Sequence, residues 1–275
     1  MTLSREGLVA EVGRLLERVR EKAPLVHNIT NFVVMNTTAN ALLALGASPV
    51  MAHAREEVED MARVAGAVVL NIGTLTPDWV QAMILAGKVA NAQGIPVVLD
   101  PVGAGATPLR TESSFELMEE VRVGILRGNA AEVGVLAGEK GEVKGVDAVA
   151  LAGDVAEMAK AAATGLKTVV SATGKTDYLS DGTCVLAVAN GHPLLARVTG
   201  TGCMVSALTG AFAAVSENML HAALAALVTF GVAAEMAFEQ AGERGPGSFH
   251  LALYDALYRI ESQDIENRAR VEVVE

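Results

Sequence analysis

The sequence predicts an α/β fold in which helices cover both faces of a mostly parallel central sheet with an antiparallel edge hairpin. Short apolar, β-branched runs alternate with longer segments of helical periodicity, which implies parallel crossovers. Hydrophobic residues make up 51% of the chain and aromatics only 4%, so Ala, Val and Leu build the core. Ser180-Asp181-Gly182-Thr183 lies between two alternating runs and predicts the hairpin. No repeat or linker divides the chain, so we expect one domain over residues 1–275.

The first hundred residues contain four expected strands, and their helices carry clear end signals. Ser4 can cap the first helix, and Leu3 and Leu8 have the spacing of a hydrophobic staple. Thr76 and Pro77 mark a helix start, with proline inside the start and glycine past the end. The expected helices are 4–19, 31–45, 55–64 and 76–94, and the expected strands are 24–29, 48–51, 67–73 and 96–100.

The alternation continues to about residue 172 and then gives way to helices. The expected helices are 113–121, 129–137 and 147–164, the expected strands are 124–127 and 167–172, and the hairpin is 177–189. Beyond Cys203 the sequence reads as nearly all helix to about Glu261, with one break at Gly245-Pro246-Gly247. The last dozen residues are rich in charge and carry no recognisable pattern.

Charge and cysteine content exclude several classes of protein. The net charge of −11, without a basic run, argues against binding of nucleic acid, which needs clustered Lys and Arg. Two cysteines are too few for a disulfide framework and suggest a reducing compartment. The charged amino terminus lacks the apolar core of a signal peptide. The apolar stretch 222–238 is bounded or interrupted by Glu217, His221 and Glu235, so we interpret it as a buried helix and expect a soluble, cytoplasmic protein with no membrane partner.

A glycine-rich turn at Val198–Met204 runs directly into a helix. Gly200, Thr201 and Gly202 offer free backbone N–H groups at the positive end of the helix dipole, where an anion such as phosphate is favoured. Cys203 lies in the first helical turn, where a thiolate is favoured. A lone Gly-x-Gly before a helix is more often a tight turn, so this motif needs support from other residues.

That support comes from polar residues that follow the predicted strands. Because ligands bind beyond the carboxyl ends of strands in open α/β sheets, we expect these residues to converge on one edge. Asp100 and Glu132 are carboxylates suited to Mg²⁺. Arg127 can neutralise a nucleotide phosphate, and Thr173 can donate a hydrogen bond to one. With the anion hole, these are the parts that phosphoryl transfer requires. The chain has no GxxxxGK[ST] loop and no protein-kinase signature.

Each of these residues also has a purely structural interpretation. Asp100 can be a turn residue before a proline, and Asn129 with Glu132 fits a variant of the capping box. His27, a single imidazole beside an apolar strand, is more often a structural group than a ligand. Only the convergence of the polar residues with the anion hole favours a site.

At this point the chain resembles the hydroxyethylthiazole kinase family, a thiamine-salvage branch of the ribokinase-like superfamily. The resemblance runs from about Pro24 to Ile260. It rests on HNITNFVVMNTTANALLALGASPVM, VVLDPVGAGAT, LRGNAAEV, SATGKTDYLSDG and VTGTGCMVSALTGAF. The most specific feature is GTGC, where the superfamily usually has Gly-x-Gly-Asp.

The resemblance implies a reaction and an assembly. ATP would phosphorylate the hydroxyl of 4-methyl-5-(2-hydroxyethyl)thiazole with Mg²⁺, and the protein would be a homotrimer with active sites between subunits. Matching positions place the thiazole against Asn28, Met51 and Gly200, ATP against Arg127 and Thr173, and the metal near Asp100 and Glu132. Cys203 takes the place of the aspartate base of relatives, either as a base or as a group that positions the substrate.

Three alternatives stay open from the sequence. The first is another ribokinase-like kinase that acts on a hydroxymethylpyrimidine or a pyridoxal-type alcohol. The second is an ATP-dependent hydro-lyase that repairs hydrated nicotinamide cofactors. The third is a nucleotide-binding protein without catalytic activity.

Overall fold

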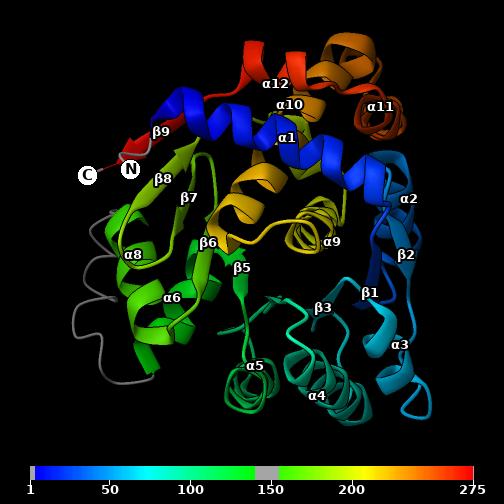
Figure 1. Cartoon of the computed structure of the whole chain (residues 1–275), viewed down its shortest axis with the longest axis vertical. Coiled ribbons are helices and arrows are strands. Elements are labelled where there is room, and N and C mark those ends of the chain that lie inside the picture. The colour runs from blue at the N-terminus through cyan, green and yellow to red at the C-terminus, as the bar shows by residue number, and fades with distance from the viewer. Residues whose placement is uncertain (1–3, 140–154, 275) are drawn as a thin grey trace.

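Nine strands form one sheet in the computed structural model, which describes residues 4–139 and 155–274. Their order across the sheet is β2-β1-β3-β4-β5-β6-β7-β8-β9 (Figure 1). The strands are β1 (Leu25–Ile29), β2 (Ser48–Val50), β3 (Ala67–Asn71), β4 (Val97–Asp100), β5 (Ile125–Asn129), β6 (Val169–Thr173), β7 (Asp177–Ser180), β8 (Val185–Val188) and β9 (Val271–Val274).

The strands from β2 to β6 are all parallel, as the alternation of strands and helices predicts. The chain leaves β1 for β2 on one side and returns to β3 on the other, so the strand order reverses between β1 and β3. A crevice opens at such a reversal, beyond the carboxyl ends of the strands. Asn71 and Asp100 are paired at these ends on β3 and β4.

The far edge of the sheet is antiparallel and one strand larger than the sequence suggests. β7 and β8 form the predicted hairpin, with Ser180 opposite Val185. Asp181 accepts N–H groups of Thr183 and Cys184 in the turn, which fixes its tight geometry. β9 then pairs antiparallel with β8. The charged carboxyl terminus, which carries no recognisable pattern in the sequence, therefore forms the ninth strand.

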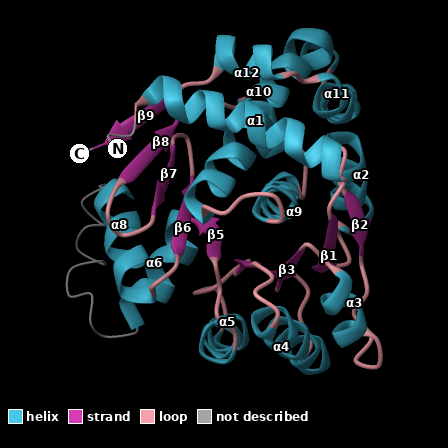
Figure 2. Cartoon of the chain, in the orientation of Figure 1, coloured by secondary structure: helices cyan, strands magenta, loops and turns pink. Residues whose placement is uncertain are grey.

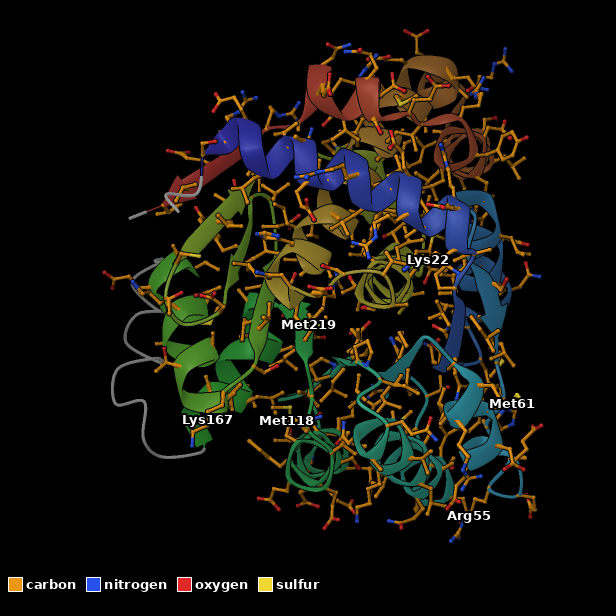
Figure 3. All side chains as sticks on the ribbon, in the orientation of Figure 1. Lys22, Arg55, Met61, Met118, Lys167 and Met219 are labelled. Atoms are coloured by element: carbon orange, nitrogen blue, oxygen red, sulfur yellow. The ribbon has the colours of Figure 1, made fainter. Side chains whose placement is uncertain are left out.

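Helices cover both faces of the sheet, as predicted (Figure 2). One hydrophobic core lies between the sheet and α1 (Arg5–Lys22), α2 (Met35–Leu45), α9 (Thr201–Ala213), α10 (Met219–Ala241), α11 (Pro246–Arg259) and α12 (Ser262–Arg268). A second core joins the other face to α3 (Val58–Val64), α4 (Pro77–Ala92), α5 (Pro108–Glu120), α6 (Ala130–Glu139) and α8 (Val155–Leu166). Side chains fill the space between these layers, while Lys22, Arg55 and Lys167 lie exposed on the outside (Figure 3).

Side-chain caps fix several helix starts and explain where the predicted bounds differ. Ser4 accepts the N–H of Gly7, and Thr76 accepts that of Trp79, as expected. Thr107 caps α5 in the same way, so this helix begins at Pro108 and not at residue 113.

Two further helix bounds differ from the prediction. α2 begins at Met35 and not at residue 31, because the side chain of Asn31 bonds to Asn71 across the sheet edge. The expected start of a helix at residue 147 lies outside the described residues, and α8 continues to Leu166.

α10 is an interior helix. Among the described residues, the segment from Met219 to Arg244 is the one helix long and apolar enough to cross a membrane, and 78% of its most apolar window is buried in the protein. α1 crosses over it, and α9 and α11 pack beside it (Figure 1). This burial is that of the core helix of a soluble protein.

Candidate active site

The amino terminus of α9 lies at the carboxyl edge of the sheet with its first N–H groups uncapped. Gly200 is the N-cap, has φ of +83° and offers no capping side chain. A Cβ at Gly200 would lie 2.5 Å from Cγ1 of Val34, so glycine is required both for the backbone and for space. The N–H groups of Thr201, Gly202 and Cys203 therefore stay available to an anion.

A chain of amides connects Cys203 to Asp100. Asn71 Nδ2 lies 2.7 Å from Asp100 Oδ2 and 3.3 Å from Cys203 Sγ. Asn31 Nδ2 lies 2.8 Å from Asn71 Oδ1 and 3.5 Å from the same sulfur. Both amides thus donate toward the thiol, and Asn71 holds the carboxylate and the sulfur in one fixed arrangement.

Asp100 is the most deeply buried acid of this group, with 1% of its surface exposed. Burial raises the pKa of its carboxyl, while Arg127 and the hydroxyl of Ser206 act in the opposite direction. Ser206 donates to Oδ2 at 2.7 Å, and Arg127 Nη1 lies 3.8 Å from the same oxygen. The other oxygen, Oδ1, is buried without a hydrogen-bond partner. A buried acceptor in this state is suited to a ligand.

The environment of Cys203 differs from the sequence-based expectation. A helix amino terminus favours the thiolate, but here burial raises the pKa of the thiol and the nearby Asp100 raises it further. The hydrogen bonds from Asn71 and Asn31 and the charge of Arg127 oppose this rise without cancelling it. The thiol is therefore neutral near pH 7, and the expectation of a lowered pKa is wrong for this site.

Glu132 stabilises the two loops that flank Asp100. Its Oε2 accepts the N–H of Asn129 at 2.9 Å, and Asn129 Oδ1 accepts the N–H of Glu132, so the capping-box interpretation is confirmed. Oε1 accepts the N–H of Gly103 at 2.8 Å. The carboxylate of Glu132 also acts on Asp100, whose pKa it raises. The two acids therefore share one electrostatic environment, in addition to the capping role of Glu132.

Arg127 and Thr173 lie side by side at one end of a cavity of about 640 Å³. Arg127 Nη2 donates to the Thr173 hydroxyl at 2.9 Å, and this hydroxyl donates to the carbonyl of Gly128. Thr201 and Gly202 line the same cavity, so it reaches the amino terminus of α9. A cavity lined by a cation, a hydroxyl and uncapped amides suits a phosphorylated ligand.

The remaining predicted residues lie on the other side of Cys203, toward β1 and β2. Asn28 is 1% exposed, donates to the carbonyl of Val26 at 3.0 Å, and leaves its Oδ1 without a partner. His27 pairs with Val50 across the sheet, so half-buried Met51 comes next to Asn28 at the strand ends. His27 itself bonds to the carbonyl of Ala52, in agreement with its structural interpretation.

The structure therefore groups the predicted residues into two sets along the carboxyl edge of the sheet. Asp100, Glu132, Arg127 and Thr173 lie on one side, and Asn28 and Met51 on the other.

Residues that the sequence reasoning did not assign complete the site. Asn31, Asn71 and Ser206 hold Asp100 and Cys203. Arg110 donates to the carbonyls of Ile72 and Gly73, which ties α5 to the loop after β3. The sequence does place Asn71 among the polar residues expected at this edge, after a predicted strand, but assigns it no role, whereas Arg110 has no local signal in the sequence.

The chain is similar to known proteins over nearly its whole length. A model of the hydroxyethylthiazole kinase family matches residues 16–263. The hydroxyethylthiazole kinase of Pyrococcus horikoshii is 58% identical over 261 residues, which cover 94% of this chain and 97% of that protein. A solved structure of hydroxyethylthiazole kinase from P. horikoshii has a TM-score of 0.89 and 55% identity, covering 96% of this chain and 99% of the other. An ADP complex of Bacillus subtilis pyridoxal kinase shares the fold, with a TM-score of 0.56 and 19% identity over 77% of this chain and 91% of that one.

Proposed function

Because this chain belongs to the hydroxyethylthiazole kinase family, it is a kinase, and we propose that it transfers the γ-phosphoryl group of ATP to the hydroxyl of 4-methyl-5-(2-hydroxyethyl)thiazole with Mg²⁺ as cofactor. The product is the thiazole phosphate of thiamine salvage. One structural observation carries the proposal. The uncapped amino terminus of α9 meets a buried carboxylate, an arginine and a thiol at the carboxyl edge of the parallel strands.

ATP lies in the cavity beside Arg127 and Thr173, with its terminal phosphate toward α9. The N–H groups of Thr201, Gly202 and Cys203 form the anion hole, with Gly200 as the turn that orients them. A Cβ at Gly202 would lie 2.9 Å from Arg127 Nη1, so glycine here allows the guanidinium to approach the helix end closely. These groups stabilise charge on the equatorial oxygens as the phosphoryl group moves.

Asp100 and Glu132 would hold Mg²⁺. The fit rests on Asp100 Oδ1, a buried oxygen without a partner, close to a second carboxylate. Mg²⁺ prefers oxygen ligands and keeps several of its waters. Both carboxylate oxygens of Glu132 already accept a backbone N–H, so Glu132 would contact the cation through such waters. When bound, the cation supplies neutralisation of phosphate charge.

The thiazole lies between Asn28, Met51 and Gly200, with its hydroxyl beside Cys203. The second N–H of the Asn28 amide can donate to the ring nitrogen, and the thioether of Met51 suits a sulfur heterocycle. Cys203 is a neutral thiol and places the hydroxyl in line with the terminal phosphate. In a loose transition state the hydroxyl keeps its proton until late. The proton then passes to an oxygen of the transferred phosphoryl group and leaves with the phosphate ester.

The assembly is a homotrimer with active sites between subunits. Phe32 and Val33 directly follow Asn31 of the site and are 62% and 60% exposed, which supports a covering by another chain. Sedimentation equilibrium should give three times the chain mass of 28.4 kDa, and a monomer mass would contradict the trimer.

Two further parts of the proposal concern the chain as a whole. Both cysteines are free, which supports a cytoplasmic location. The nine strands of one sheet support a single domain over residues 1–275.

A substrate panel tests the proposed acceptor. The protein is incubated with ATP and Mg²⁺ and, separately, with hydroxyethylthiazole, hydroxymethylpyrimidine and pyridoxal, and each phosphate ester is sought by mass spectrometry. We expect the ester of the thiazole alcohol. A product from another alcohol only, dehydration of hydrated NADH coupled to ATP, or nucleotide binding without any turnover would each replace the proposal by the corresponding alternative.

A further inference from the structure

One wall of the cavity beside Arg127 and Thr173 has no regular secondary structure. Asn190, Gly191 and His192 line it, between the end of β8 at Val188 and the 3₁₀ turn Pro193–Arg197. The backbone ladder continues only to Ala189, which also lines the cavity and whose N–H donates to the carbonyl of Arg270 at 3.0 Å. The position of the wall beyond Ala189 therefore depends on side chains that come from other elements.

Glu235 of α10 holds this wall from one side. Its Oε1 accepts the side-chain N–H of Asn190 at 3.0 Å and the backbone N–H of Gly191 at 2.9 Å. One helical turn earlier, Gly231 also lines the cavity, and a Cβ there would lie 2.6 Å from Cβ of Asn190. α10 thus approaches the wall as closely as a glycine permits, and Glu235 fixes it at that distance.

Arg270, directly before β9, holds the wall from the other side. Its guanidinium forms a fork on Glu235, with Nη2 2.6 Å from Oε1 and Nη1 3.2 Å from Oε2. The same guanidinium donates to the carbonyl of Ala189 at 2.7 Å. Asn190 returns two bonds to this segment, because its Oδ1 accepts the N–H of Arg270 and its Nδ2 donates to the carbonyl of Arg268.

We infer that Glu235 and Arg270 are positioning residues for the nucleotide, because they fix Ala189, Asn190 and Gly191 in the wall of the cavity in which it binds. The carboxyl-terminal segment thereby sets nucleotide affinity, although it lies at the far edge of the sheet. This inference rests on the proposed function only in taking the cavity as the ATP site. Neither side chain belongs to the group around Cys203, so their loss changes the KM for ATP and leaves kcat nearly constant.

The chain supplies a matched control. Arg268 and Glu239 form a second Arg–Glu pair between the carboxyl-terminal segment and α10, with Nη1 and Oε1 2.7 Å apart. Glu239 is one helical turn beyond Glu235, and neither Glu239 nor Arg268 lines the cavity. Removal of either arginine costs one ion pair on the same helix. Only the loss of the Arg270 guanidinium also removes a contact with the wall, at the carbonyl of Ala189, and the ion pair that orients Glu235.

The experiment compares Arg270→Ala and Arg268→Ala with the unchanged protein. We expect Arg270→Ala to raise the KM for ATP and the Kd for ADP, measured by calorimetry, about tenfold, with kcat within about twofold. Arg268→Ala should leave all three within about twofold of the unchanged protein. Arg270→Lys keeps the ion pair with Glu235 but not the fork, and should recover part of the affinity.

ADP binding separates the failure of this inference from the failure of the proposed acceptor. Calorimetry with ADP needs no alcohol, so a loss of ADP affinity in Arg270→Ala supports the inference even if the thiazole is not phosphorylated. Equal Kd values for ADP in Arg270→Ala and Arg268→Ala would overturn it. An unchanged protein that does not bind ADP would overturn it as well.

Discussion

The protonation state of Cys203 makes a sharp prediction about the pH dependence of the reaction. Burial and Asp100 raise the pKa of this thiol above its ordinary value, which is about 8.5, so at pH 7 at most about one thiol in thirty is ionised. If the thiolate were the base, kcat would rise between about fifteenfold and thirtyfold from pH 7.0 to 8.5, with the larger rise for a pKa further above 8.5. For a neutral thiol that positions the hydroxyl, we expect a change of less than about threefold.

The assay is turnover at saturating ATP, Mg²⁺ and thiazole alcohol, in three enzymes. Above pH 7 the terminal phosphate of ATP is largely ionised, because its second pKa is about 6, so the substrate contributes little slope. Cys203→Ala should lower kcat about tenfold without abolishing it, since loss of a base costs about a hundredfold or more. Cys203→Asp should stay active, because an aspartate is ionised at this pH and can accept the amide hydrogens of Asn31 and Asn71.

Two results would refute this reasoning. One is a rise of kcat of about fifteenfold or more in the unchanged enzyme that is absent in Cys203→Asp, since this would identify the thiolate as the base. The other is a folded but inactive Cys203→Asp enzyme, which would show that position 203 does more than place an acceptor atom beside the hydroxyl. Circular dichroism and urea unfolding of each variant separate this second result from a failure to fold.

Three more predictions test the metal, the turn and the cavity. Glu132→Gln should raise the Mg²⁺ concentration for half-maximal rate about tenfold, and an unchanged magnesium titration would remove Glu132 from the metal site. Gly200→Ala should lower the free energy of unfolding in urea by about 1–2 kcal/mol for its φ of +83° and by about 1–3 kcal/mol for the contact with Val34. Val34→Ala in the same chain should recover part of that loss, and simple additivity would contradict the contact. Burial raises the pKa of Asp177 from 3.8 to about 6, so the native state binds this proton more tightly than the unfolded state does. The free energy of unfolding should therefore fall by at most about 3 kcal/mol as the pH rises from 4 to 7. Asp177→Asn should flatten the dependence of unfolding free energy on pH in this range, and an unchanged slope would show that the carboxyl is not buried.

Local sequence signals predicted the elements whose own residues carry a strand pattern or a helix cap. The parallel strands β1 to β6 are formed by the apolar runs themselves, and caps such as Ser4 and Thr76 mark helix starts. The start of α2 could not be found in this way, since Asn31 bonds to a residue forty positions away. β9 was missed although three of its four residues are valine, because it is short and follows a charged stretch. Its pairing with β8 establishes it as a strand.

The sequence predicts that the candidate site residues lie at one edge of the sheet, but it does not predict their electrostatic environment. Asp100, Arg127 and Thr173 follow predicted strands, and the rule for parallel sheets brings such residues together. The pKa of Cys203 depends instead on burial and on Asp100, which is more than a hundred positions away in the sequence. The glycine-rich motif shows that the thiol of Cys203 lies at a helix end, but it does not show that Asp100 lies close to this thiol.

The arrangement around Asn71 gives a physical reason for a thiol at position 203. Asn71 Nδ2 lies within hydrogen-bond reach of both Asp100 Oδ2 and Cys203 Sγ, so the two groups share one donor. A second carboxylate there could accept one of the two hydrogens of this amide nitrogen, but it would repel Asp100, which is already buried. The neutral thiol avoids this cost. The penalty of Cys203→Asp should therefore appear as a lower free energy of unfolding and not as a loss of turnover.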